Sequence, residues 1–285
     1  MRAACAPALL ASLLCACSAP PEPPPAIIGQ ARVVTLAPNL TELAFDAGAG
    51  DALVGVSAWS DYPAAAARLP KVGDAFAVDR ERLATLKPDL LFAWESGTPA
   101  HVVDELRRAG YRVETIRTRS LEDVARALRR IGELTGHRDT AERAARAYSD
   151  ELAGIEAEYS GRDPIRVFYQ VSARPLYTVN GEHYVSELIR LCGGRNIFAD
   201  LGDLAPAVDV EAVVARDPEV MLASSDAGED AFAEWSRWPG LAANRYDNHF
   251  LMPADEIGRA TPRLVAAARA VCEALDTARA NRAGS

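Results

Sequence analysis

Aromatic side chains placed after apolar strand patterns are the residues of this chain that could do chemistry. Aromatics make up only 7% of its 285 residues, so their positions are informative. Trp59 and Tyr62 lie in a loop after one strand pattern, Trp94 ends another, and Tyr177 follows a third. Ligands of parallel α/β proteins bind at the carboxyl ends of strands, where rings stack on flat, partly apolar molecules. These positions predict a stacked ligand, although aromatics that merely cover a core would look the same.

Two passages of the sequence recur in the same order. Residues 78–91 hold Val-Asp-x-Glu followed by Lys-Pro-Asp-Leu-Leu, and residues 208–221 hold Val-Asp-x-Glu followed by Asp-Pro-Glu-Val-Met. Thr41-Glu42-Leu43 likewise recurs as Ser186-Glu187-Leu188. An ordered repeat predicts two lobes of similar build with the ligand between them.

The repeat places Glu81 and Glu211 at equivalent positions, in the first helical turn after the predicted N-caps Asp79 and Asp209. An acid in the first turn of a helix is favoured by the helix dipole. Two equivalent acids could also face a symmetric basic partner. The sequence leaves both interpretations open.

Motifs for catalysis are missing. The sequence has no P-loop, no Gly-x-Gly-x-x-Gly after a strand, no Gly-x-Ser-x-Gly and no His-Glu-x-x-His, so we predict no catalytic residues. Its four histidines are far apart in the sequence, which predicts surface residues and no metal site. Two other functions are alternatives. An extracytoplasmic α/β enzyme would need a reactive group in the cleft, and the sequence offers none. An adhesion or assembly module would lack an aromatic-lined cleft between the lobes.

Composition excludes further classes of protein. The net charge of -9 argues against nucleic acid or anionic lipid as main partners. No internal apolar run reaches the ~20 residues of a spanning helix. With 49% hydrophobic residues the chain can build two cores.

The N-terminus reads as a leader. Arg2, an apolar run and Leu14-Cys15-Ala16-Cys17 predict a lipoprotein signal peptide over 1–17, with Cys17 as the lipidated residue. A plain signal peptide with incidental cysteines is the alternative. Prolines over 18–30 predict a stiff tether.

The elements that must position the aromatics alternate between short apolar strands and helices. This alternation predicts an α/β fold with parallel sheets covered on both faces. A long helical pattern from Asp139 to Tyr159 interrupts it. We therefore predict two Rossmann-like lobes, over 31–137 and 161–285, joined by one backbone helix over 138–160, with the ligand cleft between the lobes. Such a helix would permit little motion between lobes.

Cys192 and Cys272 remain once the leader is excluded. In an exported protein an even remainder favours a disulfide. Two buried thiols are the alternative.

Several stretches of the sequence resemble a known family. The chain is similar, from about Arg32 to Leu275, to the helical-backbone (class III) periplasmic binding proteins of ABC importers, and within them to vitamin B12 receptors. The matching stretches are Arg32–Leu43, Trp59–Pro63, Leu86–Leu90, Cys192–Phe198 and Arg259–Arg263. The resemblance implies a periplasmic protein that binds cobalamin or a related corrinoid. It also implies delivery of that ligand to a permease with its ATPase. With the leader motif at Cys17 we expect this protein to be lipid-anchored, and we expect it to be a monomer.

The resemblance also implies roles for individual residues. Trp59, Trp94 and Tyr177 would contact the corrin ring, and Asp255 and Arg259 would approach its side chains. Tyr62 completes the predicted aromatic set.

Glu81 and Glu211 match acids that the family offers to arginines of the permease, and Cys192 and Cys272 match a disulfide pair. Both assignments follow from the resemblance alone.

The chain departs from the family at two tryptophans, which fall at or beside Ala75 and Ala205. Phe76 would replace one of them. A roomier pocket could accept another corrinoid, or haem or an iron-siderophore. That alternative would use arginines as anion contacts, namely Arg174, Arg259 and Arg263.

Overall fold

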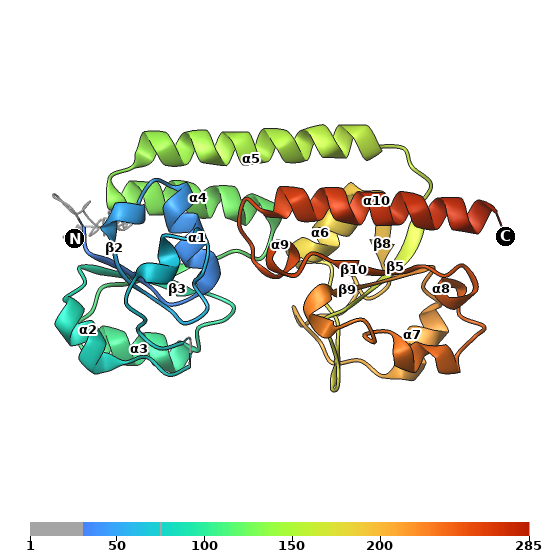
Figure 1. Cartoon of the computed structure of the whole chain (residues 1–285), viewed down its shortest axis with the longest axis horizontal. Coiled ribbons are helices and arrows are strands. Elements are labelled where there is room, and N and C mark those ends of the chain that lie inside the picture. Colours follow the sequence, from blue (N-terminus) through green and yellow to red (C-terminus); the bar gives the residue numbers. More distant parts are fainter. Residues whose placement is uncertain (1–30, 75, 285) are drawn as a thin grey trace, which may run out of the picture.

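The computed structural model describes residues 31–74 and 76–284. The predicted signal peptide, Cys17, the tether and Ala75 lie outside the described residues. Two lobes lie side by side, and the long helix α5 (Arg138–Tyr159) runs across both of them, as Figure 1 shows. None of the helices in the described part of the chain has the length and apolar character needed to span a membrane.

Each lobe contains a four-stranded parallel sheet, and the two sheets have the same topology. In both, the strands stand in the order second, first, third, fourth along the chain. The first sheet runs β2 (Leu53–Val56), β1 (Val33–Thr35), β3 (Leu90–Trp94), β4 (Val113–Ile116). The second runs β8 (Gly194–Asn196), β5 (Ile165–Gln170), β9 (Val220–Ser224), β10 (His249–Met252). The predicted pair of similar α/β lobes is confirmed.

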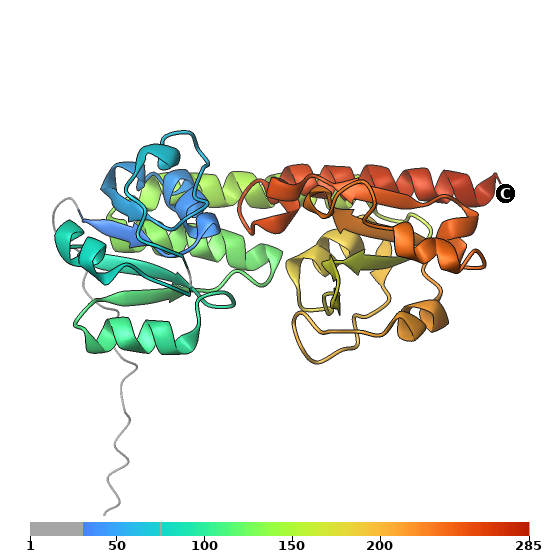
Figure 2. The same ribbon diagram turned by 60° about the horizontal axis from the view of Figure 1, so that its bottom comes forward.

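One helical layer serves both lobes. It contains α5 together with α1 (Pro38–Asp46), α4 (Leu121–Thr135), α6 (Tyr184–Leu191) and α10 (Leu264–Ala283). Figures 1 and 2 show α4 and α10 arranged along α5, and in Figure 1 they lie between α5 and the sheets, α4 in the first lobe and α10 in the second. Because a single apolar core runs through this layer and both sheets, relative motion of the lobes would disturb packed side chains.

The opposite face of each sheet has its own cover. In the first lobe Leu90 and Phe92 enter the shared core, whereas Leu91 and Ala93 pack on the other face, following the two-residue period of a strand. The outer face of the first lobe is covered by α2 (Arg80–Leu86) and α3 (Ala100–Arg108), and that of the second lobe by α7 (Val210–Arg216) and α8 (Ala242–Arg245). The short helix α9 (Ala254–Gly258), which precedes α10, instead contributes Ile257 to the shared core.

The longer sequence repeat forms the same contact in each lobe. The Asp89 carboxylate accepts a hydrogen bond from the Arg32 amide at 2.8 Å, which fixes the start of β3 beside β1. The Glu219 carboxylate accepts one from the Arg166 amide at 3.0 Å beside β5. The repeat therefore encodes a connection between neighbouring strands.

A disulfide joins Cys192, at the end of α6, to Cys272 in α10, with a sequence separation of 80 residues. In the chain-entropy description a loop of this size stabilises the fold by about 4 kcal/mol. The bond ties the last helix to the second lobe, as the sequence predicted.

The expectation that all four histidines are surface residues is wrong. His101 is exposed, but His137, His183 and His249 are partly buried. Burial lowers the pKa of His183 to about 4, because the charged imidazolium is poorly solvated there. His183 instead accepts a hydrogen bond from the Val185 amide at the start of α6.

Candidate functional site

Trp59 is the most exposed large apolar side chain of the described residues. Its side chain is 80% exposed, and its φ of 65° lies in the left-handed region that bulky residues avoid. A backbone of this kind costs about 1–2 kcal/mol and persists only where neighbours impose it. The loop after β2 therefore holds an indole in solvent against both hydrophobic and backbone preference, which indicates a binding role.

Buried hydroxyl groups impose this loop conformation. The Thr41 hydroxyl contacts the Thr35 hydroxyl at 2.7 Å and donates to the Ser60 hydroxyl at 2.9 Å, and Ser60 contacts Ser57 at 3.1 Å. Lys71 donates to the Ser60 carbonyl at 2.7 Å. The base of the loop is thus bonded to β1 and α1, and its tip carries Trp59.

Arg259 connects the second lobe to this loop. Its guanidinium donates to the Asp61 carboxylate at 2.8 Å and to the Trp59 carbonyl at 3.4 Å. It also donates to the Glu42 carboxylate at 2.8 Å. Arg259 follows α9 directly, so the segment that begins with Asp255 lies against the Trp59 loop.

Glu42 is the centre of the contact between lobes. It lies on α1 with only 1% of its surface exposed. Besides Arg259, its carboxylate accepts a hydrogen bond from the Thr261 hydroxyl at 3.0 Å and contacts Arg263 at 3.5 Å. Arg263 also stacks over the Tyr62 ring, 4.4 Å from its centroid. Since a buried charge must be paired, these contacts hold the lobes in one arrangement.

Charge pairing shifts the pKa values of Asp61 and Arg259. The hydrogen bond from Arg259 holds the pKa of Asp61 below its ordinary value. Burial alone would lower the pKa of Arg259, but its bonds to Asp61 and Glu42 outweigh burial and the net shift is upward. These groups therefore stay ionised at neutral pH.

The other predicted aromatics also lie at carboxyl ends of strands. Trp94 ends β3, and its indole N–H donates to the Thr118 hydroxyl at 2.9 Å after β4. Its ring lies so close over Gly97 that a Cβ there would come within 1.9 Å of it. Tyr177 is 37% exposed in a small hairpin that follows β5, formed by β6 (Ser172–Ala173) and β7 (Leu176–Tyr177).

Phe76 is 74% exposed and follows Gly73 in a tight loop. The Asp74 carboxylate accepts hydrogen bonds from the amides of Phe76 and Ala77, both at 2.8 Å. Ala205 is exposed and supplies no ring.

A continuous rim runs from the Trp59 loop to the Tyr177 hairpin. At the first residue of α9, the Ala254 amide donates to the hydroxyl of Ser225, which directly follows β9, at 3.2 Å. Farther along that loop, the Ala231 carbonyl accepts from the Gln170 side chain at 2.8 Å, at the end of β5. Arg174 in the hairpin pairs with Glu234 of the same loop. We call the segments 57–62, 254–263, 225–234 and 171–177 the rim.

The repeated glutamates lie elsewhere. Glu81 and Glu211 are exposed in the first turns of α2 and α7. Both helices lie on the side of the molecule remote from α5 (Figure 1). The predicted N-cap Asp79 accepts the Arg82 amide at 2.9 Å, whereas Asp209 occupies the N-cap position without a side-chain cap bond.

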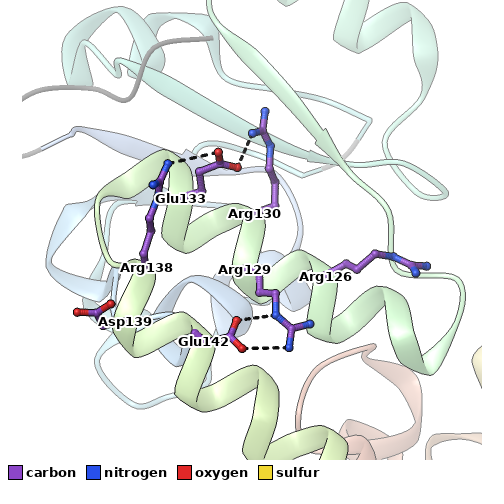
Figure 3. A pocket seen from close by; sticks show the side chains of 7 residues that line it. All are labelled: Arg126, Arg129, Arg130, Glu133, Arg138, Asp139 and Glu142. Atoms are coloured by element: carbon purple, nitrogen blue, oxygen red, sulfur yellow. Dashed lines mark hydrogen bonds and ion pairs between the residues drawn. The ribbon is translucent and has the colours of Figure 1, made fainter. Parts of the chain in front are cut away.

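A cavity of about 670 Å³ lies between α4 and α5, away from the rim, and is lined by charged side chains. Figure 3 shows that these side chains neutralise one another: Arg129 pairs with Glu142 at 2.7 Å, and Arg130 with Glu133 at 2.8 Å. Paired charges leave little to attract a ligand. Among the described residues, no group of three or more His, Cys, Asp or Glu side chains could hold a metal ion.

Sequence reasoning did not assign Glu42 or Asp61 to the site. Glu42 offered a signal: it lies on α1 between Leu40, Leu43 and Ala44, which are all buried. An acid on an apolar helix face must find a partner, although the sequence does not say which one.

Comparison with known proteins places the chain in context. A family model described as periplasmic binding protein matches residues 33–256. The vitamin B12-binding protein of Vibrio parahaemolyticus is 36% identical over 252 residues, which cover 88% of this chain and 91% of that protein. The vitamin B12-binding protein of Photorhabdus laumondii is 34% identical over 245 residues, covering 86% and 88%.

Solved structures agree with these matches. The crystal structure of the periplasmic vitamin B12-binding protein of Vibrio cholerae superposes with a TM-score of 0.79 at 35% identity, covering 88% of this chain and 98% of that one. A periplasmic haem-binding protein in complex with two haems reaches 0.76 at 24% identity, covering 87% and 98%. The latter likeness concerns the fold alone.

Proposed function

The chain belongs to the periplasmic binding protein family, and from that premise we propose that it captures cobalamin or a related corrinoid between its lobes and delivers it to an ABC importer. The relatives are binding proteins rather than enzymes, and the family places this chain in the periplasm.

The observation that carries the proposal is the set of exposed aromatics at the carboxyl ends of strands in both lobes. Trp59 and Tyr177 come from opposite lobes, are 80% and 37% exposed, and belong to one rim. A corrin is broad, flat and partly apolar, so rings on two sides suit it. Tyr62, Phe76 and Trp94 would add stacking surface.

Binding would draw on an arrangement that exists before the ligand arrives. The Glu42–Arg259 contact and the shared core already hold the lobes together. A prearranged site loses little conformational entropy on binding, which favours affinity. Asp255, 58% exposed on α9, would offer a polar contact to amides at the corrin edge.

Docking is assigned to Glu81 and Glu211. Their exposed positions on matching helices suit a partner that presents two equivalent cationic groups. We further propose that the partner is a permease with its ATPase, that Cys17 anchors the protein to the membrane, and that the protein is a monomer.

Retention of ligand tests the proposal. Purified protein is incubated with cyanocobalamin, desalted and examined by absorption spectroscopy and calorimetry. We expect the corrin absorbance to stay with the protein. Failure to bind at high micromolar cyanocobalamin would falsify the assignment, and binding of haemin or a ferric siderophore in its place would establish the alternative.

A further inference from the structure

The arginines around the rim are already paired with carboxylates. Arg259 contacts Glu42 and Asp61, each at 2.8 Å, and Arg263 contacts Glu256 at 2.7 Å. These contacts come from separate elements, since Glu42 is on α1 and Asp61 is in the Trp59 loop.

The same pairing holds at the other side of the rim and near Trp94. Arg174, in the hairpin of Tyr177, pairs with Glu234. Glu95 directly follows Trp94, and its carboxylate accepts two hydrogen bonds, at 2.6 and 2.9 Å, from Arg119, which follows β4. Arg174, Arg259 and Arg263 are the three side chains that would have served as contacts for an anionic ligand.

The charges left over in the rim are negative. Asp226, Glu229 and Asp230 are exposed in the segment that follows β9. No ion pair joins them to a cation within the described residues. Asp74 adds a carboxylate beside Phe76, and the hydrogen bonds it accepts from Ala77 and Phe76 lower its pKa, so it stays ionised.

We infer that this site selects its ligand by charge: it accepts a chelate with a neutral or cationic periphery and rejects one that carries peripheral carboxylates. The inference rests on the proposed function and extends it from a ligand family to a ligand property. A carboxylate near Arg259 or Arg174 would have to displace a protein carboxylate or lie beside it, and either event opposes binding. The amide groups around a corrin meet no such opposition.

A matched pair of ligands isolates the effect. Cyanocobalamin carries neutral peripheral amides, and mild hydrolysis of one of them yields a monocarboxylate of nearly identical shape. Calorimetry at 20 mM salt should show the monocarboxylate binding about three to ten times more weakly. Since the Debye length falls from about 20 Å to about 4 Å, the ratio should drop below about twofold in 0.5 M salt.

Variants then test which groups are responsible. Glu234→Gln releases Arg174 and should reduce the penalty on the monocarboxylate by about twofold. Removing both partners, Arg174→Gln with Glu234→Gln, should restore the original ratio. Glu142→Gln removes a similarly exposed, ion-paired acid on α5 and should leave the ratio unchanged, while circular dichroism checks that each variant is folded.

The outcomes separate this inference from the proposed function. Two results would overturn the charge selection while the corrinoid assignment stands: the monocarboxylate binds as tightly as cyanocobalamin or more tightly, or the ratio of the two affinities does not change with salt concentration. Haemin binding as tight as that of cyanocobalamin has the same consequence. If haemin binds and no corrinoid does, both fail.

Discussion

Glu42 and Glu187 occupy equivalent positions in the two lobes, and the carboxylate of each reaches the opposite lobe. Glu42, on the helix after the first strand of lobe one, holds Arg259 and Thr261 just before α10. Glu187, on the helix after the first strand of lobe two, accepts the Leu121 amide at 2.6 Å, at the first residue of α4. The shorter sequence repeat thus forms a reciprocal pair of contacts between lobes.

Removing the charge of Glu42 should destabilise the whole protein. Glu42→Gln leaves Arg259 and Arg263 partly buried without their shared carboxylate, so we expect a loss of about 3 kcal/mol in the free energy of unfolding. Glu142→Gln, in an exposed pair, should cost less than about 1 kcal/mol. Urea unfolding with the disulfide intact measures both, and equal losses would show that the pairing of Glu42 contributes no more to stability than an exposed ion pair.

Trp59 should dominate ligand affinity. Trp59→Ala removes the most exposed ring and should weaken cyanocobalamin binding about 10- to 100-fold, which corresponds to about 1.4–2.8 kcal/mol. Tyr111→Ala, at the amino end of β4, provides a control ring outside the rim. Tryptophan fluorescence titration provides the measurement, and comparable affinities for the two variants would remove Trp59 from the site.

Loss of Glu81 and Glu211 should impair docking to the permease without affecting ligand binding. The double variant Glu81→Ala with Glu211→Ala should bind cyanocobalamin normally but fail to support transport, because the cationic groups of the permease lose their partners. The matched control replaces Glu158 and Glu273, exposed acids on α5 and α10 on the far side of the molecule (Figure 1). Uptake of labelled cobalamin in cells is the readout. If the double variant still supports transport, Glu81 and Glu211 have no role in docking and serve only to stabilise the first turns of their helices.

Asp46 should make stability depend on pH. Burial, together with the negative charge of nearby Glu42 and against the opposing effect of Arg263, raises its pKa from 3.8 to about 6. The folded protein therefore keeps this proton at a pH where the unfolded chain has lost it. Its stabilising effect is complete below pH of about 4 and is lost as pH rises through about 6.

Asp46→Asn cannot ionise, so it should exceed the wild type by about 1–3 kcal/mol in unfolding free energy at pH 7 and match it near pH 4. Asp51→Asn, an exposed aspartate close by, is the control. Urea unfolding from pH 4 to 7 measures the effect. A difference that is constant with pH would mean that Asp46 acts through packing.

The sequence by itself determined the features that depend on local patterns. Strands alternating with helices specified two parallel sheets, and the helical pattern from Asp139 onward matched α5, whose bounds are Arg138–Tyr159. The place of Trp59 in the loop after a strand was also visible in the sequence. Such signals are local, because backbone preferences and side-chain periodicity act over a few residues.

Only the tertiary structure decided how charges pair. Arg259 meets Asp61 and Glu42 across 198 and 217 residues of sequence, and Glu187 meets Leu121 across 66. A guanidinium can pair with any carboxylate that the fold brings near, and packing of the lobes makes that choice. The left-handed backbone conformation of Trp59 could not be predicted from the sequence either. It results from hydrogen bonds between the loop and α1, and not from the conformational preference of a tryptophan.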